Sequence, residues 1–251
     1  MKSYGRQALL FFILFLATFS VFAGDSQDYN LAVTRAALHV LGQSPQPLQL
    51  LKGTYVNMVV FTTFSGYKLT DKALTGTIWV TVEPEIKKLC AEYVAKNKAY
   101  LTTHQLNIWI AQLLGVSANK VDKRRFVVLR IPVIQAYYGT PAKDIGIFRP
   151  CADPRIGPHA DGSPICPERM NPHAAIAADY KTWFINTSMA AYTLNGGMPW
   201  TAYGYTYNWN PQASQAYGIS EFVILKNTPV RVLANPFNAT TAYISAAQYC
   251  S

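Results

Sequence analysis

Apolar residues recur along the chain at two spacings, one typical of strands and one typical of helices. Residues 55–64 and 77–82 are rich in valine, threonine and aromatic residues, which predicts two strands, and residues 126–134 predict a third. Residues 83–96 and 102–114 instead carry apolar side chains three and four positions apart. This spacing predicts two amphipathic helices between the second and third strands.

Local signals mark the ends of these helices. Pro84 suits a first helical turn, and Thr102 with Gln105 forms the pattern of a capping box. Gly115 is placed to end the second helix. We expect further helices over residues 29–41 and 171–192.

The last third of the chain has the spacing of strands. In the segment PWTAYGYTYNW, aromatic residues occupy alternate positions, and a regular strand would point them all to one side: Tyr203, Tyr205, Tyr207 and Trp209. Residues 219–226 and 229–234 are apolar around a turn at 227–229, which predicts a hairpin. The order of elements predicts an α+β fold, a single domain with a mostly antiparallel sheet and about three or four helices.

The first 23 residues have a pattern of their own. Lys2 and Arg6 precede an uncharged apolar run that ends on Val21 and Ala23, which indicates an export signal over residues 1–23, cleaved after Ala23. The apolar run is shorter than the ~20 residues of a spanning helix. We therefore expect residues 24–251 to be one secreted or periplasmic domain, with no membrane span after cleavage.

Charge narrows the class of partner. Cleavage would remove Lys2 and Arg6 but no acidic residue, so the formal charge would fall from +9 to about +7. A positive charge of this size favours an anionic surface, a glycan or an anionic protein ligand. The densest basic run, residues 120–125, is short, and we interpret it as a solvated turn rather than a nucleic-acid site.

The cysteines indicate the compartment. All four lie after the leader, and an even number in an exported protein predicts two disulfides, with three pairings open. Cys151 and Cys166 flank a short loop, and closing a short loop costs little entropy, so we favour a bond between these two cysteines. That bond would leave Cys90 to pair with Cys250. A zinc site would need cysteine and histidine spacings that do not occur here, so we expect no metal.

The loop between Cys151 and Cys166 is rich in proline, glycine and aspartate. These residues encode turns, so a loop closed for stability is the interpretation we favour. The alternative is a site in which Asp153, His159 and Asp161 ligate a cation such as calcium. His159 and Asp153 could also act as a general base and the group that orients it.

The aromatic strand also has two interpretations. Exposed, its four rings would form a stacking platform for sugar rings, bases or peptides. Buried, they would form one face of the core. The small and polar residues between them, Gly204, Thr206 and Asn208, favour burial.

Five segments together carry a resemblance: HQLNIWIAQLLGV, FRPCADP, PWTAYGYTYNW, GISEFVI and the terminal YC. They resemble a group of exported bacterial proteins to which no activity is assigned, over roughly residues 81–250. The resemblance implies a bacterial source, export, a cysteine framework and a single domain. It implies no catalytic residues.

Glu221 carries a second resemblance. The segment SEFVILKNTPVRVL resembles the end of mono-ADP-ribosyltransferase and NAD-glycohydrolase domains, where a catalytic glutamate lies at the start of a hairpin. The resemblance implies that Glu221 stabilises an oxocarbenium-like ribose as nicotinamide leaves, while Arg130 binds phosphate or ribose. The structural alternative is a glutamate on an edge strand, paired with Arg231.

The function we expect is extracellular or periplasmic binding of a ligand beside the aromatic strand and the cysteine loop, without a cofactor. The alternative is an NAD-consuming enzyme that takes NAD as its substrate and uses Glu221. That enzyme would need Arg130 and Glu221 to face one cleft.

Overall fold

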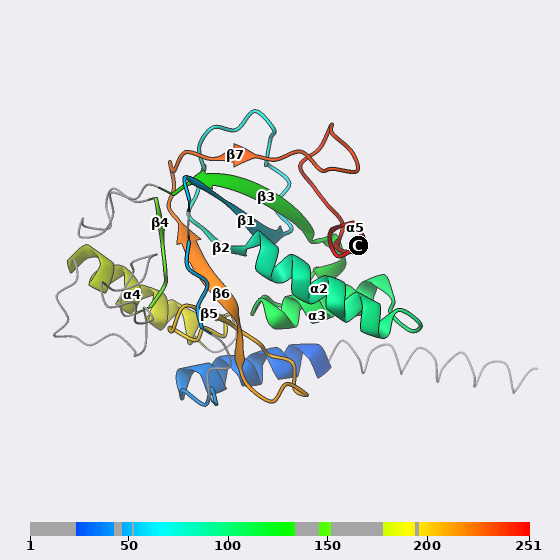
Figure 1. Ribbon diagram of the computed structural model, residues 1–251. Coiled ribbons are helices and arrows are strands. Elements are labelled where there is room, and N and C mark those ends of the chain that lie inside the picture. Colours follow the sequence, from blue (N-terminus) through cyan, green and yellow to red (C-terminus); the bar gives the residue numbers. More distant parts are fainter. Residues whose placement is uncertain (1–23, 43–46, 52, 134–145, 152–177, 194–195) are drawn as a thin grey trace, which may run out of the picture.

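A curled antiparallel sheet, shaped like half a barrel, lies at the centre of the structure (Figure 1), a computed structural model. The structure describes residues 24–42, 47–51, 53–133, 146–151, 178–193 and 196–251. The strand order is β4-β6-β2-β1-β3-β7, and β5 also pairs with β6. The strands are β1 Tyr55–Thr62, β2 Ile78–Val82, β3 Arg125–Pro132, β4 Ile147–Phe148, β5 Tyr205–Tyr207, β6 Tyr217–Ile224 and β7 Arg231–Val232.

Four substantial helices surround the sheet in the described part of the chain, so the α+β prediction is confirmed. They are residues 24–37, α2 Glu83–Asn97, α3 Thr103–Leu113 and α4 Ala178–Ala191, with the short α5 Ala246–Tyr249 near the carboxyl end. The predicted capping box is present, because Thr102 Oγ1 accepts from the Gln105 amide at 3.2 Å and the Gln105 side chain accepts from the Thr102 amide at 2.8 Å. Figure 1 shows α2, α3 and α5 gathered on one side of the sheet.

The alternation along β3 divides the core between the two faces of the sheet. Phe126 and Val128 pack into the cluster beneath α2 and α3. Val127, Leu129 and Ile131 pack into a second cluster on the opposite face. A strand buried on both faces has an almost continuous apolar sequence. Arg130 lies on the same face as Val128, yet it is exposed.

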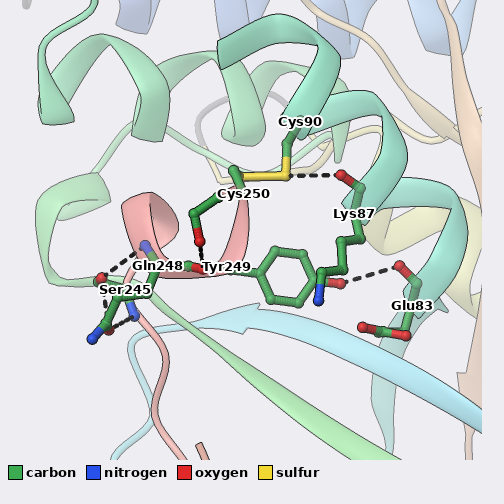
Figure 2. The surroundings of a disulfide bond; sticks show 8 residues. Glu83, Lys87, Cys90, Ser245, Gln248, Tyr249 and Cys250 are labelled. Atoms are coloured by element: carbon green, nitrogen blue, oxygen red, sulfur yellow. Dashed lines mark hydrogen bonds between the residues drawn. A yellow bond between two sulfur atoms is a disulfide. The ribbon is translucent and has the colours of Figure 1, made fainter. Parts of the chain in front are cut away.

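The predicted pairing of Cys90 with Cys250 is confirmed, and it ties the carboxyl end of the chain to α2 (Figure 2). Tyr249, the residue before Cys250, stacks on Phe126 with ring centroids 4.0 Å apart. Its hydroxyl donates to the Glu83 carbonyl oxygen at 3.2 Å. The disulfide therefore holds α5 against both α2 and β3.

The predicted hairpin between residues 219–226 and 229–234 is wrong. β6 and β7 do not pair, and they lie on opposite sides of the β2–β1–β3 unit. β6 already bonds β2 along one edge and β4 and β5 along the other, so it has no free edge for β7. The connecting segment instead runs beside residues 72–74, where Val230 N–H donates to the Lys72 carbonyl oxygen at 3.0 Å.

The predicted leader, residues 1–23, lies outside the described residues. The helix that follows over residues 24–37 buries Ala32 and Ala36 in the main core cluster. Of the helices in the described ranges, none combines the length and the apolar character needed to cross a membrane.

Candidate functional site

The aromatic strand contributes to the core rather than to an open platform. Tyr205, Tyr207 and Trp209 are buried, and Tyr203 is partly buried. Only Tyr205–Tyr207 form a strand, and its register with β6 shifts between those two residues. The four rings therefore do not share one face: Tyr207 and Trp209 join the cluster under α3, whereas Tyr205 packs with Leu48.

Most of the cysteine loop lies outside the described residues, including Asp153, His159, Asp161 and Cys166. Cys151 is described, is fully buried and is not a free thiol. In the described ranges, no three side chains of His, Cys, Asp or Glu come together as a metal site would require.

Glu221 is buried inside the sheet, only 8% exposed. It lies on β6 opposite Thr81 of β2, so the prediction of an edge strand paired with Arg231 is wrong. Burial raises the pKa of its carboxyl well above the usual range, and the nearby indole N–H of Trp200 acts in the opposite direction. Within the described residues Glu221 Oε2 and Trp200 Nε1 have no hydrogen-bond partner, so the two groups do not reach bonding geometry.

A second polar group is buried on the opposite face of β6. Arg149 is 0% exposed, and its guanidinium lies over the Phe222 ring with Cζ 4.5 Å from the centroid. One nitrogen donates to the Gln49 carbonyl oxygen at 2.6 Å, while Nε and Nη1 have no partner among the described residues. Desolvation lowers the pKa of Arg149 to about 10. Its proximity to Tyr205 and, to a smaller degree, Glu85 partly offsets this effect.

Arg130 is not beside Glu221. Both side chains are on the same face of the sheet, but β2 and β1 lie between β6 and β3. At the usual strand spacing, the β6 and β3 backbones are therefore roughly 14 Å apart, measured across the strands. Arg130 lines a pocket at the β7 edge, and Glu221 is not among the described residues that line that pocket. The geometry that the NAD-consuming alternative requires is therefore absent from the described part of the chain.

Arg130 instead lines a basic pocket of about 470 Å³ at the β7 edge of the sheet. This basic pocket is formed, among the described residues, by Tyr55, Lys72, Arg130, Pro132, Pro229, Val230 and Arg231. β3 and β7 supply the two arginines as directly opposed partners, so both side chains leave the sheet on the same face. Tyr55 on β1 supports Arg130, whose guanidinium Cζ lies 4.8 Å from the centroid of its ring.

The three cations of the basic pocket have no acidic partner in the described ranges. No salt bridge is formed there by Lys72, Arg130 or Arg231, and no carboxylate lines the pocket. Asp71, which adjoins Lys72, accepts from the Lys68 amide at 2.8 Å within its own turn. Like charges directly opposite each other on paired strands destabilise a sheet, so this arrangement carries a cost in stability.

Only one of these residues was identified from the sequence. Arg130 stood out as a charge inside an apolar strand, but Arg231, Lys72 and Tyr55 are distant in the sequence and carry no motif. The association of Arg231 with Arg130 depends on the β3–β7 pairing, which no pattern in the sequence predicted.

Comparisons with protein-family models, with curated proteins and with solved structures found no match.

Proposed function

We propose that this chain is an exported, disulfide-stabilised bacterial protein that binds an anionic ligand in the basic pocket. The observation that carries the proposal is the pair of opposed arginines, Arg130 and Arg231, which converge with Lys72 on one open cavity without a carboxylate in its described lining. In this proposal Cys151 and Cys166 form a second disulfide, as their sequence spacing favours.

Two physical arguments support an anion. Guanidinium groups present planar, paired N–H donors that match the oxygens of carboxylates and phosphates. Arg130 is also preorganised by its contact with Tyr55, so part of the entropic cost of fixing its side chain is met before binding. The pocket replaces the aromatic strand and the cysteine loop as the expected binding surface.

The test is calorimetric titration of the purified protein with inorganic sulfate and inorganic phosphate at low ionic strength. We expect saturable binding of at least one anion, weakened about ten-fold or more in the Arg130→Gln/Arg231→Gln variant, because each guanidinium supplies charge-assisted hydrogen bonds.

The matched control is Lys120→Gln/Lys123→Gln, which removes the same net charge from two exposed lysines elsewhere on the surface. It should bind like the unmodified protein. Equal weakening in both variants would mean that binding follows net charge alone, and the pocket would lose its assignment.

A further inference from the structure

We infer that the ligand of the basic pocket carries a phosphoryl dianion, as a phosphate monoester does, on a molecule larger than the phosphate itself. This inference rests on the proposed function, because it names the class of anion that the same pocket takes. It follows from the number of positive charges, the size of the cavity and the absence of internal counter-ions in the described lining.

The number of charges favours a dianion over a carboxylate. One monoanion would neutralise one of the three cations and leave Arg130 and Arg231 still opposed across β3 and β7. A phosphate monoester carries a charge near −2 at neutral pH and three acceptor oxygens. One oxygen can be shared with each guanidinium and the third with Lys72, so one group can relieve the repulsion between both arginines.

The cavity is too large for the anion alone. Its volume of about 470 Å³ falls within the range of pockets that hold small organic ligands, roughly 300–1,000 Å³. The rest of the lining is apolar, with Pro132, Pro229 and Val230 beside the exposed ring of Tyr55. An uncharged organic portion of the ligand would fit against these residues.

The alternative is that the positive charges of the basic pocket protect the edge of the sheet instead of binding a ligand. Charged residues on an edge strand prevent edge-to-edge association, and β7 is an edge strand. That role would explain Arg231 alone, but not Arg130 on the neighbouring strand or Lys72 from the 72–74 segment. It also predicts that removal of Arg231 promotes association of the protein without changing its affinity for any small anion.

The pH dependence separates a phosphate ligand from other anions. The described lining of the basic pocket contains tyrosine, lysine and arginine, but no histidine or carboxyl group, the side chains that usually titrate between pH 4 and 8. Of the adjoining charged groups, Asp71 is held by the Lys68 amide. Between pH 5 and 8 the change in affinity should therefore follow the second ionisation of the ligand, near pH 6.

The experiment measures binding of glycerol 3-phosphate, inorganic phosphate, acetate and methylphosphonate monomethyl ester, a monoanion, at pH 5.0 and pH 7.5. Glycerol 3-phosphate should bind more tightly than inorganic phosphate, at least ten-fold more tightly than either monoanion, and several-fold more tightly at pH 7.5 than at pH 5.0. Arg130→Lys and Arg231→Lys keep the charge but lose the paired donors, and each should weaken glycerol 3-phosphate binding about ten-fold.

Two sources of a phosphate monoester are distinguished by a further arm, binding to vesicles that contain phosphatidic acid and to vesicles that contain only phosphatidylcholine. Binding to phosphatidic acid vesicles that soluble glycerol 3-phosphate displaces assigns the source to a lipid headgroup, and binding of the soluble ester alone assigns it to a free metabolite.

The outcomes separate this inference from the proposed function. If acetate binds as tightly as glycerol 3-phosphate, with no change between the two pH values, the phosphoryl inference is wrong and anion binding stands. If none of these anions binds at low ionic strength, both are wrong. If Arg231→Gln self-associates with anion affinity unchanged, the edge role explains the charge and the inference is wrong.

Discussion

Cys90 on α2 and Cys250 at the end of the chain are joined across 160 residues of sequence, with their Cα atoms 5.2 Å apart. The bond closes a covalent loop that contains β3 to β7, whereas β1 and β2 precede it in the chain. It also fixes Tyr249 against Phe126, the residue at which β3 enters the core.

Removal of this disulfide should destabilise the protein strongly. The chain-entropy account assigns about 5 kcal/mol to a loop of this length, and measured losses for small exported domains are about 2–5 kcal/mol. We expect Cys90→Ala/Cys250→Ala to lower the free energy of unfolding by a value in that range, measured by urea denaturation. Amide exchange should show the first loss of protection at α5 and the Phe126 end of β3. A variant with unchanged unfolding and unchanged protection would contradict this account.

The buried carboxyl of Glu221 should make stability fall as pH rises. Its pKa in the folded protein is raised above the unfolded value, so the folded state keeps a proton that the unfolded state releases. Stability is therefore complete below about pH 4.5 and is lost, at up to about 1.4 kcal/mol per pH unit, as pH rises towards the raised pKa. Glu221→Gln removes this dependence, so the variant should gain stability relative to the unmodified protein between pH 5 and 8.

The matched control for this measurement is Glu92→Gln, which changes an exposed glutamate on α2. Its stability should differ from the unmodified protein by a constant amount at every pH. The burial argument fails if the difference between Glu221→Gln and the unmodified protein is also flat across pH.

NAD should not be consumed. Burial disfavours the charged carboxylate of Glu221, the form that could stabilise a developing positive charge, and Arg130 lies across two intervening strands. Chromatography of the purified protein with NAD should therefore detect no nicotinamide above the blank. Release that disappears in Glu221→Gln would instead support the enzyme.

Gly204 should not tolerate a side chain. Its φ is +78°, and an added Cβ would lie 2.8 Å from both Cγ and Cδ of buried Arg149. Gly204→Ala should therefore cost about 2–3 kcal/mol of stability, the sum of left-handed backbone strain and a displaced guanidinium. Gly76→Ala, where no heavy atom would lie within 4 Å, should leave stability unchanged or raise it by up to about 1 kcal/mol. Equal effects at the two positions would contradict the described packing of Arg149.

Local signals in the sequence predicted local structure well. The capping box at Thr102, the proline near the start of α2 and the strand composition of β1 depend on neighbouring residues, and all three elements are present. The pairing of Cys90 with Cys250 was predicted by elimination, because local closure favoured Cys151 with Cys166.

Long-range pairing could not be read from the same signals. The segment after β6 has the composition of a hairpin turn, but the hydrogen-bonding capacity of β6 is filled by strands from elsewhere in the chain. The wrong pairing also affected the prediction of the basic pocket. Because β7 was assigned to β6, nothing in the sequence placed Arg231 beside Arg130. The irregular register of β5 likewise divided aromatic residues that regular alternation had placed on one face.

The most direct test of the central claim is NMR observation of the arginine Nε–H resonances during titration with glycerol 3-phosphate. Anion binding in the basic pocket predicts that the signals of Arg130 and Arg231 shift together and saturate at one shared dissociation constant, while those of Arg124 and Arg125 stay fixed. Shifts that are centred on Arg124 and Arg125, or that are absent from Arg130 and Arg231, would contradict it.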